Sequence, residues 1–135
     1  MKENISILVV DSQDMMQKLL HKILTQDGYC VVTAPDGEEA LRLLNERKIA
    51  IMICDLSIPG MNGFDLLKTA KERQPELVVI MMTALGDTYT VKDALLLGAD
   101  EYITKPFKSF EISMIVERAY WRLLSQNRVA APPAP

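Results

Sequence analysis

The amino-acid sequence predicts an α/β protein built on a doubly wound, mainly parallel sheet. Short apolar runs rich in β-branched residues alternate along the chain with segments whose apolar residues recur every three or four positions. The first pattern is typical of buried strands and the second of amphipathic helices. Their alternation indicates β–α units joined by right-handed crossovers. Five such units occupy most of the 135 residues, so the length suits a single domain.

Five apolar runs are expected to form the strands of this sheet. They cover residues 5–10, 29–34, 49–54, 77–82 and 102–104. The third run is apolar throughout and lacks the alternation of a half-exposed strand. We therefore expect it at the centre of the sheet, with helices covering both of its faces.

A helical pattern follows each of these runs. Gly28 and Gly98 are expected to end the first and fourth helices, because glycine readily adopts the conformation found just after a helix C-terminus. Asp87 and Ser109 are expected to cap the N-termini of the fourth and fifth helices. The apolar positions of the five helices are, in chain order, Met16, Leu19, Leu20, Ile23 and Leu24; Ala40, Leu41 and Leu44; Phe64, Leu67 and Ala70; Val91, Ala94 and Leu95; and Ile112, Ile115, Val116, Ala119 and Leu123.

Composition and charge narrow the possible partners and the compartment. Fifteen basic and 18 acidic residues give a net charge of −3, and no basic cluster offers a binding surface to nucleic acid. No apolar stretch approaches the roughly 20 residues of a membrane span, and the first apolar run is too short for a signal peptide. Cys30 and Cys54 both fall within apolar runs, so we expect them to be buried in the core of a cytoplasmic protein.

Four polar side chains stand at the ends of predicted strands. Asp11, Asp55, Thr83 and Lys105 end the first, third, fourth and fifth strands respectively. The carboxyl ends of parallel strands lie along one edge of a sheet, where open α/β sheets bind their ligands. One strand-ending aspartate would be ordinary, because aspartate disfavours strands and caps helices. Two carboxylates, a hydroxyl and an ammonium at one edge indicate a functional site.

The segments around these four positions resemble the response-regulator receiver domains of bacterial two-component signalling. The shared motifs are Val9-Val10-Asp11, the segment Asp-Leu-Ser-Ile-Pro-Gly-Met-Asn-Gly that starts at Asp55, Thr83-Ala84, and Lys105-Pro106-Phe107. The resemblance runs from residue 5 to about residue 124 and implies a flavodoxin-like sheet with strand order 2-1-3-4-5 and five flanking helices. We assign residues 1–126 to this domain and residues 127–135 to a Pro/Ala-rich tail or linker.

The resemblance implies a phosphorylation-dependent switch in a phosphorelay, not an enzyme with an external substrate. Asp55 matches the aspartate that accepts a phosphoryl group from a histidine kinase, and Lys105 matches the cation beside the phosphoryl oxygens. Thr83 matches the hydroxyl that moves to bind the phosphoryl group, and Tyr102 matches an aromatic residue whose rotation accompanies that movement. Such a domain assists only its own phosphorylation and dephosphorylation.

The resemblance also implies a Mg²⁺ site, with one departure from the family pattern. Asp11, Asp55 and the backbone carbonyl of Ser57 match the oxygen ligands of that ion, which prefers hard donors. The family usually has two adjacent acids after the first strand, whereas this chain has Asp11 followed by Ser12. Because one expected carboxylate is missing, we expect weaker Mg²⁺ binding than in a typical receiver.

Two kinds of partner follow from the resemblance. A sensor histidine kinase or a phosphotransfer protein would donate the phosphoryl group. An output domain or a second receiver would bind the face formed by the fourth helix, fifth strand and fifth helix. Met114 and Trp121 lie outside the inner stripe of the last helix, and we expect them to border that face together with Tyr102.

Other functions on the same sheet remain as alternatives. A degenerate receiver that acts as a phosphorylation-independent interaction module is favoured only by Ser12. A haloacid-dehalogenase-like phosphatase needs a second aspartate two residues after its nucleophile, and here Ser57 takes that position after Asp55. A flavin or dinucleotide binder needs a glycine-rich turn after the first strand, which the chain lacks.

Overall fold

The computed structural model of the chain describes residues 2–84 and 91–130. Its strands form one five-stranded parallel sheet in the order β2-β1-β3-β4-β5, which confirms the predicted fold class and strand order. The strands are β1 (Ser6–Val10), β2 (Cys30–Ala34), β3 (Ile51–Asp55), β4 (Val78–Ala84) and β5 (Glu101–Lys105). Each strand begins and ends within two residues of the run predicted for it.

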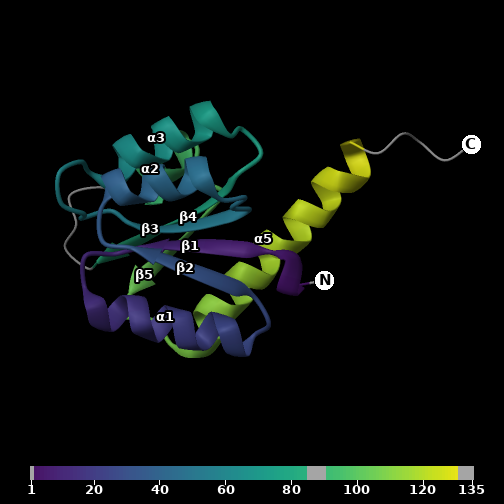
Figure 1. Ribbon diagram of the computed structural model, residues 1–135, viewed down its shortest axis with the longest axis horizontal. Helices are drawn as coiled ribbons and strands as arrows, with labels where there is room; N and C mark the ends of the chain where they lie inside the picture. Colours follow the sequence, from purple (N-terminus) through teal and green to yellow (C-terminus); the bar gives the residue numbers. More distant parts are fainter. Residues whose placement is uncertain (1, 85–90, 131–135) are drawn as a thin grey trace, which may run out of the picture.

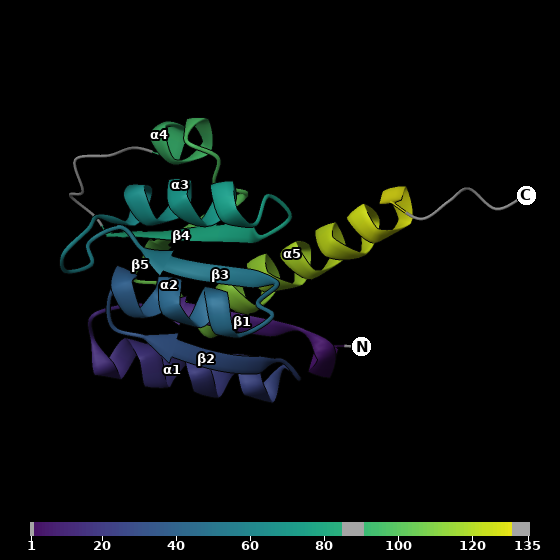
Figure 2. The ribbon, with the colours of Figure 1, turned by 45° about the horizontal axis from the view of Figure 1, so that its top comes forward.

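Helices cover both faces of the sheet (Figure 1). A short 3-10 helix η1 (Lys2–Asn4) precedes β1, and the α-helices are α1 (Asp14–Gln26), α2 (Gly37–Glu46), α3 (Gly63–Arg73), α4 (Val91–Leu96) and α5 (Ser109–Ala130). Helices α1 and α5 pack on one face, and α2, α3 and α4 pack on the other (Figure 2). Within the described ranges, no helix is both long and apolar enough to cross a lipid bilayer.

The core is divided into two layers by the alternation of side chains along the strands. In β3, Met52 and Cys54 point toward α2 and α3, whereas Ile51 and Ile53 point toward α1 and α5. Every residue of β3 is buried, as expected of a central strand. The buried position of Cys54 next to Asp55 confirms that its thiol packs in the core.

Three expectations from the sequence need correction. Cys30 is exposed rather than buried, because β2 is an edge strand, and its Sγ lies 3.2 Å from the carbonyl oxygen of Glu3. Ser109 is the first residue of α5 rather than its cap, and the Glu111 carboxylate instead accepts the Lys108 N–H at 2.7 Å. Helix α5 also continues to Ala130, into the segment assigned to the tail, because no proline interrupts the helix before Pro132. The proposed cap Asp87 lies outside the described residues.

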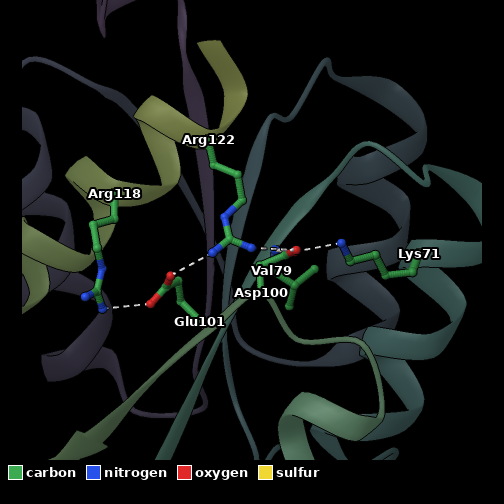
Figure 3. A network of polar contacts seen from close by, with 6 residues as sticks. All are labelled: Lys71, Val79, Asp100, Glu101, Arg118 and Arg122. Atoms are coloured by element: carbon green, nitrogen blue, oxygen red, sulfur yellow. Dashed lines mark hydrogen bonds and ion pairs between the residues drawn. The ribbon is translucent and has the colours of Figure 1, made fainter. Parts of the chain in front are cut away.

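A charged network joins four elements at the amino-terminal end of β5 (Figure 3). The Asp100 carboxylate accepts hydrogen bonds from the Val79 N–H at 2.8 Å and from Lys71 Nζ at 2.7 Å. Arg122 of α5 reaches Glu101 at 3.0 Å and Asp100 at 3.5 Å. The network therefore connects α3, β4 and α5 to the start of β5. The polar strand-ending residues lie at the opposite, carboxyl-terminal edge of the sheet.

Candidate functional site

The predicted polar residues gather at the carboxyl-terminal edge of the sheet. Asp11 directly follows β1, Asp55 is the last residue of β3, and Lys105 is the last residue of β5. Thr83 stands near the end of β4, one residue beyond the partner of Asp55 in the β3–β4 register. In the parts of the chain that the structure describes, the only buried polar residues are Asp11, Asp55 and Thr83. Burying polar groups is unfavourable unless they are paired, so this concentration marks the edge as a built site.

Lys105 links the two carboxylates. Its Nζ lies 2.7 Å from Asp11 Oδ2 and 3.1 Å from Asp55 Oδ2, and its side chain is only 15% exposed. Burial by itself would lower the pKa of Lys105, but hydrogen bonds and charge from Asp11 and Asp55 outweigh burial and raise it. Lys105 is therefore held as an ammonium between two carboxylates.

Asp55 experiences opposing effects on its charge. Burial raises the pKa of its carboxyl group, and the nearby Asp11 carboxylate raises it further. The hydrogen bond and positive charge of Lys105 act in the opposite direction without cancelling the increase. Burial also raises the pKa of the neighbouring Cys54 thiol, which keeps that sulfur protonated in the core. Asp55 is consequently a buried carboxyl group whose charged form is disfavoured by burial and by Asp11 and stabilised by its ion pair with Lys105.

The start of α1 positions Asp11. The Gln13 N–H donates to Asp11 Oδ1 at 2.8 Å, and Gln17 Nε2 donates to the Asp11 carbonyl oxygen at 2.7 Å. The Asp11 N–H also continues the sheet by donating to Ala34 at 3.1 Å. The sequence did not predict the roles of Gln13 and Gln17. The sequence contains one indication of these roles: Gln17 follows Gln13 by one helical turn, so the two residues lie on the same face of α1.

The loop between β3 and α3 positions Asp55. The Ser57 N–H lies 3.3 Å from Asp55 Oδ1, and the Gly63 N–H donates to the Leu56 carbonyl at 2.8 Å. A Cβ atom at Gly63 would lie 2.7 Å from the Asp55 carbonyl oxygen and 2.9 Å from Met81 Cε. Only glycine fits at this point, where α3 begins against the end of β3.

Tyr102 lies apart from the buried group. It pairs with Met81 in the β4–β5 register, three residues before Lys105, and its side chain is 36% exposed. Met114 and Trp121 are 63% and 55% exposed, on the face of α5 opposite its buried face. The structure thus brings Asp11, Asp55 and Lys105 into contact, places Thr83 at the same edge, and leaves the three predicted surface residues accessible.

The residues present fit a Mg²⁺ ion that keeps part of its water shell. Asp11 and Asp55 offer carboxylate oxygens, and the Ser57 carbonyl offers a third protein ligand, whereas Mg²⁺ commonly takes one or two carboxylates and several waters. In residues 2–84 and 91–130, no three acidic, histidine or cysteine side chains come together as a metal cluster. Ser12 is exposed and adds no charge. The chain therefore offers a donor set with two carboxylates.

The sequence is similar to known signalling proteins over most of its length. A family model described as the response regulator receiver domain matches residues 7–117. The alkaline phosphatase synthesis transcriptional regulatory protein PhoP of Bacillus subtilis (strain 168) is 34% identical over 129 residues, which cover 96% of this chain and 52% of PhoP. The transcriptional regulatory protein CpxR of Escherichia coli (strain K12) is 38% identical over 125 residues, which cover 90% of this chain and 53% of CpxR. The chain thus spans about half the length of these relatives.

Solved structures show the same fold. A response regulator receiver domain protein from Clostridium thermocellum superposes with a TM-score of 0.82 at 29% identity, covering 94% of this chain and 99% of that one. NtrX from Brucella abortus, in complex with ADP, superposes with a TM-score of 0.88 at 32% identity. That match covers 93% of this chain and 29% of NtrX.

Proposed function

Because the chain belongs to the response-regulator receiver family, we propose that it is a cytoplasmic signalling switch that accepts a phosphoryl group on Asp55. The donor would be the phosphohistidine of a sensor histidine kinase or of a phosphotransfer protein. One observation carries this proposal above all: the Lys105 ammonium bridges the buried carboxylates of Asp11 and Asp55, at 2.7 and 3.1 Å. This arrangement supplies a nucleophile and a fixed cation in one pocket.

The proposed transfer is a displacement at phosphorus. A carboxylate oxygen of Asp55 forms the new O–P bond while the N–P bond to the donor histidine breaks, and the imidazole released takes up a proton. Lys105 neutralises charge on the phosphoryl oxygens, and Thr83 donates its hydroxyl hydrogen to one of them. Asp11, Asp55 and the Ser57 carbonyl would hold Mg²⁺, which when bound supplies further positive charge to those oxygens.

Phosphorylation would act as a switch through charge. It replaces the single negative charge of the Asp55 carboxylate with a phosphoryl group that carries roughly −1.5 to −2 charges at neutral pH, so the pocket around Lys105 gains at most about one further negative charge. Movement of Thr83 toward the phosphoryl group, with rotation of the half-exposed Tyr102, would carry the change to the surface of α4 and β5. The domain would turn over no external substrate and would assist only its own phosphorylation and dephosphorylation.

The proposed partner of the switched surface is an output domain or a second receiver. Apolar side chains are exposed on and just after α4, where Leu95, Leu96 and Leu97 are 48%, 73% and 51% accessible. Together with Tyr102 on β5 they form a surface suited to a partner. The relatives named above are transcriptional regulators about twice as long as this chain, which supports an output function linked to the domain.

A degenerate receiver remains the second candidate, and one observation favours it. Lys105 and the backbone already satisfy the carboxylates of Asp11 and Asp55 without a metal, and Ser12 adds no acid. A site that is neutralised in this way could serve only as a structural core for an interaction module. The two candidates differ in whether Asp55 becomes phosphorylated.

Phosphorylation with radiolabelled acetyl phosphate and Mg²⁺ tests the proposal. We expect wild-type protein to acquire label that hydroxylamine releases, as an acyl phosphate should, and Asp55→Asn to acquire none. Asp14→Asn is the matched control, because Asp14 is an exposed carboxylate at the start of α1 paired only with Lys18 in the structure. Label that persists in Asp55→Asn would refute the site, and an unlabelled wild-type protein would favour the degenerate receiver.

A further inference from the structure

A pocket lies at the amino-terminal edge of the sheet, at the opposite end of the strands from Asp55. It has a volume of about 370 Å³, which suits a small molecule. Figures 1 and 2 both show the carboxyl-terminal part of α5 projecting past this edge, and the helix contributes Leu123 to the pocket. We call this hollow the edge pocket; it is lined by residues 4–6, 48–50, 74, 76, 77 and 123.

Four large apolar residues take part in the lining of the edge pocket. Ile49 and Leu77 are buried, and they precede β3 and β4 respectively. Ile5 and Leu123 are half-buried and pack against the core layer between the sheet and helices α1 and α5. Covering the part of these side chains that is still accessible with an apolar group is favourable. The lining therefore selects a ligand that has an apolar body.

Hydrogen bonds between the loops fix the shape of the edge pocket. The Ala50 N–H donates to the Ser6 carbonyl oxygen at 3.0 Å, which joins the loop before β3 to the start of β1. The Leu77 N–H donates to the main-chain carbonyl oxygen of Gln74 at 3.0 Å. Gln74 Nε2 donates in turn to the Leu44 carbonyl oxygen at 3.0 Å. Because these bonds already order the lining, a ligand loses less free energy to ordering when it binds.

Two charges of opposite sign stand in the same lining. Lys48 comes from the loop before β3 and Glu76 from the loop before β4, and these strands are neighbours in the sheet. Both side chains are exposed, and neither forms an ion pair or hydrogen bond within residues 2–84 and 91–130. The hydroxyl of Ser6, which is half-buried, also has no hydrogen-bond partner in those ranges. The lining thus offers an ammonium, a carboxylate and a hydroxyl to a ligand.

We propose that the edge pocket binds a small zwitterion with an apolar body, the class of the free apolar α-amino acids. The carboxylate of the ligand pairs with Lys48 and accepts the hydroxyl hydrogen of Ser6, and its ammonium pairs with Glu76. Its side chain covers Leu77 and Leu123. Because ion pairs between exposed groups are weak, most of the affinity comes from the apolar side chain. We expect a dissociation constant of about 0.1–1 mM for L-leucine, as for a ligand of so few atoms.

Binding at the edge pocket does not depend on the phosphorylation proposed for the opposite edge of the sheet. Leu123 follows Arg122, which the network in Figure 3 connects to Asp100 and Glu101. A ligand that covers Leu123 therefore adds a contact at the point where α5 leaves the sheet. Since it binds the folded state, it also stabilises the domain.

Titration of the complete, isotope-labelled chain with L-leucine, followed by amide NMR spectra and without a phosphoryl donor, tests the proposal. We expect saturable shifts of the Ser6, Ala50 and Leu77 amides, whereas the amides of Asp11 and Asp55 should not move. Isocaproate lacks the ammonium of leucine and isoamylamine lacks its carboxylate. Each should bind about three- to fivefold more weakly than L-leucine, because each loses one ion pair. Glycine, which lacks the apolar body, should cause no saturable shift at the same concentrations.

Two variants test which residue holds which charge of the ligand. Lys48→Gln should lose the preference for L-leucine over isoamylamine, and Glu76→Gln should lose the preference for L-leucine over isocaproate. Lys22→Gln and Glu72→Gln are the matched controls, because both residues are exposed and lie outside the lining, and both preferences should survive in them. Circular dichroism establishes that each variant remains folded. The proposal would be overturned if L-leucine caused no saturable shift at the edge pocket, or if both preferences persisted in Lys48→Gln and Glu76→Gln.

Discussion

At the scale of single residues, we expect Ser12 to limit how strongly the pocket can bind a divalent cation. Both carboxylate oxygens of Asp11 already accept hydrogen bonds, Oδ1 from the Gln13 N–H and Oδ2 from Lys105 Nζ. A cation at the site must therefore compete with Lys105 for Asp11. A second carboxylate at position 12 would relieve that competition, because it adds a negative charge with no partner of its own.

Replacing Ser12 by aspartate is expected to strengthen Mg²⁺ binding roughly tenfold or more. Two unit charges about 4 Å apart attract by about 4 kcal/mol at an effective dielectric of 20, and the loss of hydration offsets part of this. The rise in unfolding temperature with Mg²⁺ concentration measures the affinity, since a ligand that binds only the folded state stabilises it. Ser12→Asn is the control, because asparagine has the size of aspartate but no charge, and it should bind Mg²⁺ as wild type does. Equal Mg²⁺ dependence in Ser12→Asp and wild type would contradict the argument.

Tyr29 is expected to lower the free energy of unfolding as the pH becomes alkaline. Burial raises the pKa of its phenol, and the charges of Glu117 and Asp27 raise it further. The folded state therefore retains the phenolic proton more strongly than the unfolded state, whose pKa is about 10. The resulting stability is fully present below pH 10 and is lost as the pH rises above it. Urea unfolding should show wild type losing about 1 kcal/mol more than Tyr29→Phe between roughly pH 9 and pH 11. An equal loss of unfolding free energy in wild type and Tyr29→Phe would contradict a role for the Tyr29 phenol.

The contacts of single residues were only partly predictable. The strand-ending positions of Asp11, Asp55 and Lys105 could be predicted, because the sheet period and parallel topology bring strand ends together. The exposure of Cys30 could not, since it depends on which strand lies at the edge of the sheet. Nor could the bridging position of Lys105 Nζ, because it requires the side-chain geometry of three strands at once.

At the scale of elements, the junction between β3 and α3 couples packing to the site. Gly63 begins α3 directly against Asp55, and a methyl group there would meet main-chain atoms that have no freedom to move. At Gly37, by contrast, an added methyl would meet only the flexible side chain of Met61. Two glycines at the first positions of neighbouring helices thus differ in what surrounds them.

Gly63→Ala is expected to lower the free energy of unfolding by about 2 kcal/mol, as overpacking a core position typically does. It should also slow the labelling of Asp55 by acetyl phosphate, because the backbone at Asp55 must shift. Gly37→Ala is the matched control and should change stability by less than about 1 kcal/mol. Urea denaturation measures both values. Equal stability of the two variants would show that the close contact at Gly63 relaxes without cost.

The periodicity of apolar residues predicted which segments are helices and which are strands. The exact ends of these elements depend on tertiary contacts, which that periodicity does not reveal. The apolar stripe of α5 predicted its buried face, and Ile112, Val116 and Ala119 are indeed inaccessible. The extension of α5 to Ala130 was not predicted, since those residues lack an inner stripe to define them. The exposure of Phe110 also went unpredicted, because an apolar residue near a helix start is ambiguous without the neighbouring helix.

At the scale of the whole molecule, the question is how much of α5 the domain needs in order to fold. Among residues 109–126 of α5, whose side chains the structure describes, Leu123 is the last that packs against the core, and Arg122 is the last in the charged network with Asp100 and Glu101. Both lie before residue 126, the proposed end of the domain. The cooperative unit should therefore be complete at Gln126.

A chain that ends at Gln126 is expected to unfold in one transition, with a free energy within about 1 kcal/mol of the complete chain and an unchanged urea dependence. A chain that ends at Glu117 is the control, because it loses Ala119, Arg122 and Leu123, and burial of the two apolar side chains alone is worth several kcal/mol. Urea unfolding at low micromolar concentration, followed by circular dichroism, keeps association of copies from contributing. A large loss of stability on ending at Gln126 would move the domain boundary into the projecting part of α5, and that part would then belong to the fold.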